Sequence, residues 1–137
     1  MTTQHQLTST SANQTVLVTG AAGLIGSATT RLLLSKNYRV IACDNLSIGN
    51  WRGVSDGLIW ETLDVSSRSF IERLNSYDID LVIHCAAHPG GLSLAEPVRD
   101  VEVNALGSMR LFEWCAKVGA PVFFTSSSSV YGSQPHE

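Results

Sequence analysis

The chain has 137 residues, of which 44% are hydrophobic and 15% charged, and its 9 basic and 12 acidic residues give a net charge of -3. This length allows one domain with a sizeable buried core, and the charge balance argues against a nucleic-acid-binding surface. No apolar run approaches the ~20 residues of a membrane-spanning helix, so we expect neither nucleic acid nor a membrane as a partner.

The first 14 residues (MTTQHQLTSTSANQ) are polar and show no apolar periodicity. They lack the basic-then-apolar pattern of a secretory signal, and we expect them to form a disordered tail. Residues 15–137 contain no repeat and no linker, and we expect them to form one domain. Three widely spaced cysteines, Cys43, Cys85 and Cys115, lie in apolar stretches without metal-like spacing. They predict free, buried thiols in a reducing compartment, the cytoplasm, and no metal site.

Short β-branched runs alternate with longer helical stretches along the domain. Five strands are predicted, at 15–19 (TVLVT), 39–43 (RVIAC), 58–63, 81–85 (LVIHC) and 122–125. Helices are predicted at 24–35, 67–75 and 97–118, with a loop at 45–57. In the first helix, five apolar residues recur at helical spacing: Leu24, Ile25, Ala28, Leu32 and Leu33.

Strands separated by helices predict an α/β fold in which right-handed crossovers build a parallel sheet covered on both faces. We expect a Rossmann-type, doubly wound sheet of about five strands in the order 3-2-1-4-5. In this order the switch point lies between strands 1 and 4, and ligands bind beyond the carboxyl ends of the strands. The sheet is expected to stop after strand 5.

The segment TGAAGLIG, residues 19–26, joins the first strand to the first helix. Gly20 permits a tight turn, Gly23 lets the backbone approach a pyrophosphate, and Gly26 lets the helix lie close to the strand. The free N–H groups at the helix start carry a partial positive charge that binds phosphate. Tight turns need glycine anyway, but the position between a buried strand and an amphipathic helix predicts dinucleotide binding.

Two carboxylates follow predicted strands. Asp44 ends the second strand, where it can accept hydrogen bonds from the adenosine ribose hydroxyls. A 2′-phosphate there would meet a like charge, and the next cation along the chain, Arg52, is eight residues away, so NAD is preferred over NADP. Asp64 ends the third strand and has two readings: it caps the following helix, or it binds the adenine amino group.

Two histidines flank the fourth strand's end. His84 lies inside the strand, and we expect a hydrogen-bonded core residue rather than a catalytic one. His88 lies on the loop over the presumed nicotinamide position, where contact with substrate is the alternative to an ordinary loop role.

The long helix at 97–118 is apolar on more than one side. One set of residues is expected to face the sheet: Val98, Val101, Ala105, Met109 and Phe112. A second set spreads over further faces: Val103, Leu106, Leu111, Trp114 and Val118. A helix that is apolar on two sides must bury both, either under another element of the same chain or in a homo-oligomer interface.

The motifs TGAAGLIG, CDNLSIGN, LDVSS, HCAAH, VNALGS and TSSSSVYG together resemble the extended short-chain dehydrogenase/reductase family. Within it they are similar to the NAD-dependent nucleotide-sugar epimerases and dehydratases. The resemblance covers residues 16–132, and its motifs are individually modest but jointly specific in order and spacing. It implies the following cofactor-binding residues: Gly20, Gly23, Leu24, Ile25 and Gly26 at the phosphates, Asp44 and Asn45 at the ribose, Asp64 and Val65 at the adenine, Ala86 and Ala87 along the nicotinamide half, and Asn104 supporting the strand ends.

The resemblance also implies hydride transfer between a sugar carbon of a nucleotide-sugar substrate and NAD. The family uses a tyrosinate base whose pKa is lowered by the lysine of Y-x-x-x-K. Ser127, four residues before the tyrosine of VYG, would be the catalytic hydroxyl, although serines here can also satisfy backbone groups at a strand end. Tyr131 cannot be that base, because Pro135 occupies the lysine position and no lysine follows Lys117.

We therefore expect the N-terminal, cofactor-binding portion of an epimerase or dehydratase, without the base or most of the substrate pocket, and inactive alone. A homo-oligomer through the 97–118 helix is expected. Two alternatives remain. The missing base favours a non-catalytic NAD-binding or regulatory module. An NADPH-dependent sugar reductase of the same family is disfavoured by Asp44.

Overall fold

The computed structural model describes residues 14–51 and 55–132; the rest of the expected tail and residues 133–137 lie outside the described residues. Five parallel strands form one sheet in the order β3-β2-β1-β4-β5, which confirms the predicted Rossmann-type topology. The strands are β1 Thr15–Thr19, β2 Arg39–Asp44, β3 Leu58–Thr62, β4 Leu81–His84 and β5 Val122–Phe124. The helices are α1 Leu24–Ser35, α2 Arg68–Leu74, α3 Gly90–Ser93, α4 Pro97–Asp100, the π-helix η2 Val101–Gly107, α5 Ser108–Val118 and the 3₁₀ turn η3 Ser128–Tyr131.

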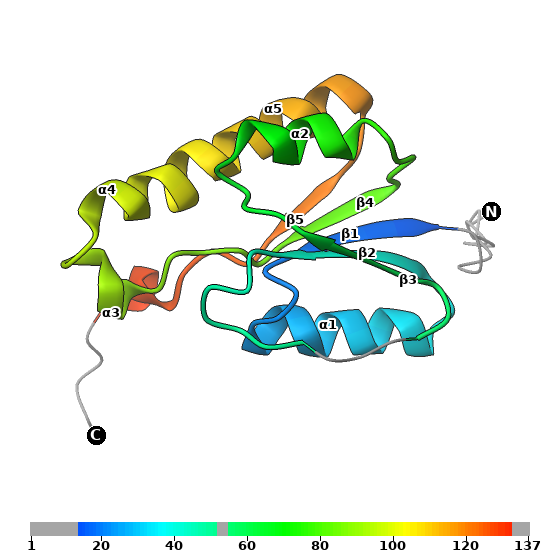
Figure 1. Cartoon of the computed structure of the whole chain (residues 1–137), viewed down its shortest axis with the longest axis horizontal. Coiled ribbons are helices and arrows are strands. Elements are labelled where there is room, and N and C mark those ends of the chain that lie inside the picture. The colour runs from blue at the N-terminus through cyan, green and yellow to red at the C-terminus, as the bar shows by residue number, and fades with distance from the viewer. Residues whose placement is uncertain (1–13, 52–54, 133–137) are drawn as a thin grey trace, which may run out of the picture.

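Helices cover both faces of the sheet, with α1 on one side and α2 and α5 on the other (Figure 1). The central strand β1 is buried along its whole length. Val16 and Val18 belong to the core on the α1 side, and Leu17 belongs to the core that also contains Phe70 and Leu111. A strand buried on both faces needs apolar residues at every position, which is why TVLVT reads as a continuous run.

The connection from β2 to β3 contains no helix among its described residues. Trp51 on this loop instead stacks on Trp60 of β3, with ring centroids 5.9 Å apart and planes 4° from parallel. The Arg31 guanidinium of α1 lies 5.6 Å from the Trp51 ring centroid, a cation–π distance. Trp60 packs against the core on the α1 side of the sheet. Through Trp51, the loop therefore covers β3 on that side.

The long helix runs through α4, η2 and α5, and a different face packs on the sheet from the one expected. Four buried residues point inward: Val103, Leu111, Trp114 and Cys115. The expectation that Val98, Val101, Ala105 and Met109 face the sheet is wrong, since all four are exposed, whereas Phe112, the fifth residue of that set, is half-buried and packs edge-on against the His84 ring. A Cβ at Gly107 would come within 3.2 Å of the Val65 carbonyl oxygen, so η2 lies close against the main chain that follows β3.

Helix α1 packs on the sheet with only part of its apolar residues. Leu24, Ile25 and Leu32 are 90%, 56% and 59% exposed, whereas Gly26 and Thr30 are its buried residues and Leu33 is packed against the core. A Cβ at Gly26 would overlap the carbonyl oxygen of Gly20, so the start of the helix lies tightly against the glycine turn. The apolar spacing therefore predicted the helix correctly, but most of the residues that form the pattern are exposed.

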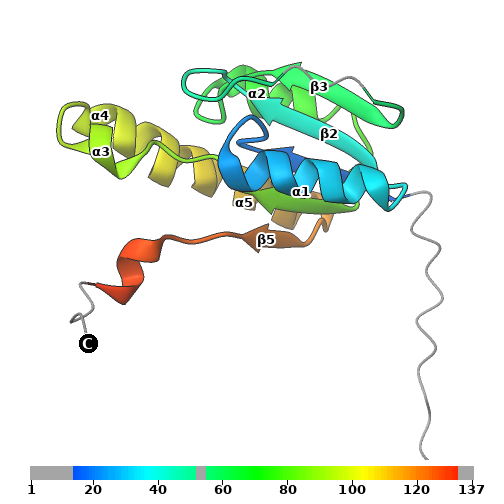
Figure 2. The same ribbon diagram turned by 90° about the horizontal axis from the view of Figure 1, so that it is seen from below.

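Strand β5 forms one edge of the sheet. Phe123 and Phe124 are 63% and 50% exposed, and the chain then leads away from the sheet into η3 (Figure 2). No helix within residues 14–51 and 55–132 has the length and apolar character needed to cross a bilayer.

Candidate functional site

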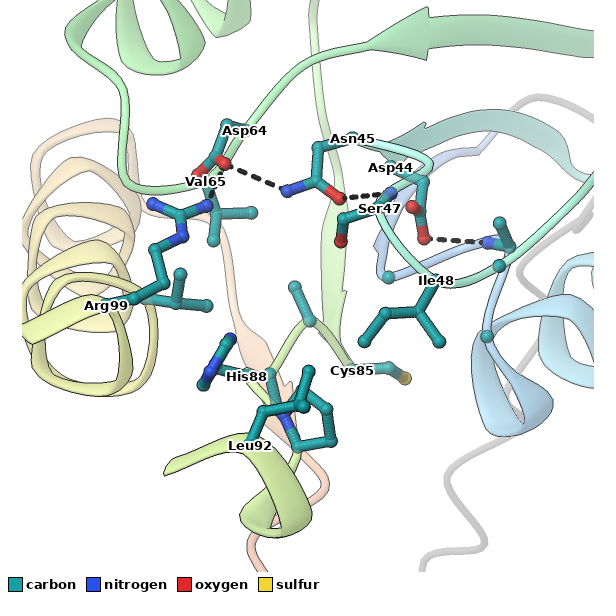
Figure 3. Close-up of a pocket in the computed structure, with 18 of the residues that line it drawn as sticks. Asp44, Asn45, Ser47, Ile48, Asp64, Val65, Cys85, His88, Leu92 and Arg99 are labelled. Atoms are coloured by element: carbon teal, nitrogen blue, oxygen red, sulfur yellow. Dashed lines mark hydrogen bonds and ion pairs between the residues drawn. The ribbon is translucent and has the colours of Figure 1, made fainter. Parts of the chain in front are cut away.

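A cleft of about 550 Å³ opens at the carboxyl ends of the strands, between the glycine turn, the ends of β2 and β3, and the loop after β4 (Figure 3). Nine of the predicted site residues line it: Gly20, Gly23, Leu24, Asp44, Asn45, Asp64, Val65, Ala86 and Ala87. Four others do not: Ile25, Gly26, Asn104 and Ser127. The cleft lies at the edge of the sheet where the predicted strand order places the ligand.

The glycine turn leaves the start of α1 open to the cleft. Gly20 has φ +65°, and a Cβ there would lie 2.7 Å from the Ala86 nitrogen, so both conformation and space require glycine. Gly23 precedes α1 in extended conformation, and no side chain caps the helix. Its leading N–H groups therefore remain available to an anion.

Asp44 holds the glycine turn against the end of β2. Its Oδ2 accepts a hydrogen bond from the Ala22 N–H at 2.9 Å, and its Oδ1 accepts one from the Leu46 N–H at 2.7 Å. Each carboxylate oxygen can accept a second hydrogen bond, so two hydroxyl groups of a ribose could still bind here. Figure 3 shows Asp44 between the turn and the cleft. Arg52, the next cation along the chain, lies outside the described residues.

Asp64 joins three parts of the fold at the other end of the cleft. Its Oδ1 accepts hydrogen bonds from the N–H and hydroxyl of Ser66 at 2.8 and 2.6 Å. Its Oδ2 accepts one from Asn45 Nδ2 at 2.9 Å and forms an ion pair with Arg99 of α4. Burial by itself would raise the pKa of Asp64, but the hydrogen bonds from Ser66, Asn45 and Arg99 outweigh it and lower the pKa to about 2.

These contacts bear on the two readings of Asp64. The helix-capping reading is wrong, because Ser67 caps α2, its Oγ accepting a hydrogen bond from the Phe70 N–H at 3.2 Å. For the adenine reading, the four hydrogen-bonding directions of the Asp64 carboxylate already have partners within the chain. The sequence analysis missed Arg99, because its partner lies 35 positions away.

His84 links the glycine turn to the long helix. It is fully buried, with Nδ1 2.6 Å from Thr19 Oγ1 and Nε2 2.8 Å from Ser108 Oγ. Burial lowers its pKa to about 4, so the ring is neutral at pH 7. The expected hydrogen-bonded core histidine is confirmed. Thr19 Oγ1 also accepts a hydrogen bond from the Ala86 N–H at 3.2 Å, which fixes the start of the loop that lines the cleft.

Asn104 supports the part of the cleft wall that His88 forms. Asn104 lies in η2, and its side chain binds the main chain of His88 rather than lining the cleft. The His88 side chain is 9% exposed and lines the cleft near Arg99 and Leu92 (Figure 3). It lies toward the Asp64 end of the cleft (Figure 3), which differs from the expected place over the nicotinamide.

Ser127 lies outside this cleft. It is exposed, and its Oγ accepts a hydrogen bond from the Ser129 N–H at 3.2 Å, which caps η3. Thr125 donates from its N–H and hydroxyl to the His84 carbonyl oxygen, so the chain leading to Ser127 is tied to β4. Ser127 is therefore held near the end of β4 without lining the cleft.

The three cysteines are free thiols. Cys43 and Cys115 are buried, and burial raises their pKa values to about 12 and about 11. Cys85 is only half-buried, contrary to the expectation for all three, and lines the cleft. In the part of the chain that the structure describes, no group of three or more His, Cys, Asp or Glu side chains could hold a metal ion.

Comparisons with a family model, with curated sequences and with solved structures all point to the same family. Residues 16–137 match the model of the NAD dependent epimerase/dehydratase family. A putative UDP-glucose 4-epimerase of Methanocaldococcus jannaschii is 36% identical over 85% of the chain, and a UDP-glucose 4-epimerase of Klebsiella pneumoniae is 34% identical over 88% of the chain and 94% of its own length. The crystal structure of Thermus thermophilus UDP-glucose 4-epimerase in complex with NAD superimposes with a TM-score of 0.79 and 35% identity over 89% of the chain. The chain spans 39% of the archaeal relative and 40% of the crystallised one.

Proposed function

Because the chain belongs to the NAD-dependent epimerase/dehydratase family, we propose that residues 15–137 are the NAD-binding portion of a nucleotide-sugar epimerase or dehydratase. The observation that carries this proposal is the uncapped start of α1, which faces the cleft beside Asp44. Phosphate binds at such a helix start, and a carboxylate at the end of the second strand binds the adenosine ribose. The glycine positions fit the cofactor, since side chains there would fill the turn.

Each end of the cleft has a role in holding the cofactor. We assign the phosphates to Gly20, Gly23, Leu24, Ile25 and Gly26, the adenosine ribose to Asp44 and Asn45, and the nicotinamide side to Ala86 and Ala87. Asp64 and Val65 form the wall at the adenine end, and Asn104 acts through the loop that it holds. When bound, NAD supplies the hydride acceptor for a sugar carbon.

We assign the catalytic hydroxyl to Ser127. Its Oγ accepts a hydrogen bond from Ser129 and keeps its own hydrogen free to donate to a substrate oxygen. Pro135 occupies the place of a lysine that would lower the pKa of Tyr131, so this chain has no base of that kind at Tyr131. We expect the 137-residue chain to bind NAD without converting a nucleotide sugar. A non-catalytic NAD-binding module would also bind NAD, and the position of Ser127 outside the cleft favours it.

Titration with NAD tests the cofactor site. We expect saturable binding by calorimetry, and at least a tenfold loss of affinity in Gly23→Val, where a branched side chain covers the phosphate position beside the Gly20 carbonyl oxygen. Ala28→Val is the matched control, because Ala28 is exposed on the same helix. Unchanged binding in Gly23→Val, or equal losses in both variants, would contradict the proposed site. Conversion of UDP-galactose to UDP-glucose by the chain alone would contradict its inactivity.

We further propose a homo-oligomer through the long helix, in the cytoplasm. Four exposed apolar residues on that helix support an interface: Val98, Val101, Leu106 and Met109. Three free thiols fit a reducing compartment.

A further inference from the structure

The His88 side chain carries a polar atom that the described residues leave unpaired. The side chain is 9% exposed, and its Nε2 is buried without a hydrogen-bond partner in the part of the chain that the structure describes. The nearest carboxylate oxygen, Glu96 Oε2, lies 3.7 Å away, beyond hydrogen-bonding distance. Buried polar atoms in native proteins are almost always paired, so a partner from outside the chain is the simplest explanation.

The position of His88 indicates which part of a dinucleotide that partner belongs to. Phosphates at the start of α1 and a ribose at Asp44 direct the base toward the far end of the cleft. Val65, Leu92, His88 and Arg99 lie on that side of the cleft (Figure 3), and Val103 is a further apolar residue of its lining. Apolar walls with a few polar groups are the usual surroundings of a bound base. At this end of the cleft, the buried His88 side chain offers an Nε2 that has no hydrogen-bond partner among the described residues.

The carboxylate at the same end is already fully engaged. Asp64 accepts hydrogen bonds from Ser66, Asn45 and Arg99 in all four directions available to it. A purine edge could bind Asp64 only by displacing one of these partners. His88 Nε2 has no partner to lose, and an imidazole nitrogen can either donate or accept.

We propose that His88 binds the edge of the purine base of the dinucleotide through Nε2, and thereby contributes to recognition of its adenosine half. This inference rests on the proposed function, and it places base recognition on the loop after β4 as well as on the end of β3. Asn104 supports the contact, because it holds the His88 main chain.

Calorimetric titration of the chain with ADP-ribose tests the proposal, because this probe contains the purine, its ribose and both phosphates but no nicotinamide. We expect His88→Phe, which keeps the ring and removes both nitrogens, to bind ADP-ribose at least tenfold more weakly. His88→Gln places an amide close to the position of Nε2 and is expected to recover most of the affinity. Ribose 5-phosphate, which has no base, should bind all three proteins equally weakly.

The outcomes separate this inference from the function on which it rests. If the unchanged chain does not bind ADP-ribose, the proposed function is wrong and the inference falls with it. If the chain binds ADP-ribose and His88→Phe binds it equally well, only the inference is wrong. Equal losses in His88→Phe and His88→Gln, together with lowered melting temperatures in both, would also overturn the inference, because they would assign His88 a purely structural role.

Discussion

Asn104 holds the main chain of His88 from both sides. Its Oδ1 accepts a hydrogen bond from the His88 N–H at 2.7 Å, and its Nδ2 donates to the His88 carbonyl oxygen at 3.1 Å. The same Nδ2 donates to Asp100 Oδ1 at 2.8 Å, which orients the amide. A residue of the π-helical turn therefore fixes the loop that forms one wall of the cleft.

Asn104→Ala should loosen this loop without unfolding the domain. We expect faster amide hydrogen exchange in residues 86–93 and up to about thirtyfold weaker NAD binding, because two hydrogen bonds of about 1 kcal/mol each to the loop are lost. Asn104→Asp keeps the acceptor but places a carboxylate oxygen against Asp100 Oδ1 and the His88 carbonyl oxygen, so it should weaken binding at least as much. Exchange in β1 and β2 should stay unchanged. Wild-type exchange in the loop of Asn104→Ala would show that the clamp is dispensable.

We expect the Asp44 carboxylate to determine the choice between NAD and NADP. We expect Asp44→Asn to weaken NAD binding about tenfold or more, because hydrogen bonds to a charged group contribute roughly 1.5–3 kcal/mol. The same change removes the repulsion of a 2′-phosphate, so the ratio of NADP to NAD affinity should rise. Asparagine retains one oxygen for the turn contact that Asp44 makes with Ala22.

Parallel titrations of both cofactors measure that ratio. Asp78→Asn is a matched control, because Asp78 does not line the cleft. A ratio that is the same in wild type and Asp44→Asn would remove Asp44 from cofactor discrimination.

The ion pair between Asp64 and Arg99 should stabilise the fold above about pH 4. The pKa of Asp64 lies below its ordinary value, at about 2, so its contribution is complete above the unfolded-state pKa and is lost as the pH falls toward 2. Both side chains are about 30% exposed, so solvent screening reduces the contribution to about 1–2 kcal/mol. Ser66 and Asn45 lower the pKa of Asp64 more than Arg99 does, so we expect Arg99→Met to lower the free energy of unfolding by only part of that amount at pH 7 and by little at pH 2.

Urea unfolding of wild type, Arg99→Met, Asp64→Asn and the double variant measures this coupling as a double-mutant cycle. A coupling energy of zero at pH 7 would mean that the two residues are neighbours without mutual stabilisation.

The strand order and most element bounds were predictable because they depend on local pattern. The continuous run at 15–19 and the helix at 24–35 appear in the structure with the predicted bounds, since a β-branched run between a polar tail and a glycine turn fits few other structures. The strand order follows from right-handed crossovers, which leave few arrangements for this alternation.

The packing faces of the helices were not predictable in the same way. Residue spacing shows that a helix has an apolar side, but the close contacts of Gly26 with Gly20 and of Gly107 with Val65, which also orient the helices, depend on main chain outside the helix. A π-helical turn also shifts the angular position of every residue after it. At the cleft, the glycines and Asp44 were identified because their chemistry is tied to one turn, whereas Arg99 depends on a partner distant in sequence.

The exposed apolar stripe on the long helix predicts self-association. This stripe consists of Val98, Val101, Leu106 and Met109, which are 72%, 53%, 43% and 58% exposed, and exposed apolar side chains gathered on one helix are typical of interfaces. We expect Met109→Lys to shift the protein toward a monomer in light scattering coupled to size-exclusion chromatography. Lys117→Ala is a control on the same helix outside the stripe. Equal masses for wild type and Met109→Lys would exclude this stripe from the interface.

His84 should give the stability of the protein a pH dependence that begins well above the titration of Asp64. Burial lowers the pKa of His84 from 6.5 to about 4, so between these values the unfolded chain binds a proton that the folded chain does not. Stability therefore rises with pH across this window and falls as the pH is lowered from about 6.5 to about 4. The shift corresponds to a loss of about 3 kcal/mol, and below about pH 4 this dependence should end.

The His84→Asn variant tests this reasoning without relying on absolute stability. An asparagine side chain does not titrate, so the unfolding midpoint of the variant should not change with pH between 4.5 and 6.5. The variant should nevertheless be less stable than wild type at pH 7, because the contacts with Thr19 and Ser108 are weakened. Urea midpoints at pH 4.5, 5.5, 6.5 and 7.5 give both slopes. If the wild-type and variant midpoints changed in parallel with pH, the proton would be taken up elsewhere. If only the wild-type midpoint falls, His84 is the group that the fold holds neutral.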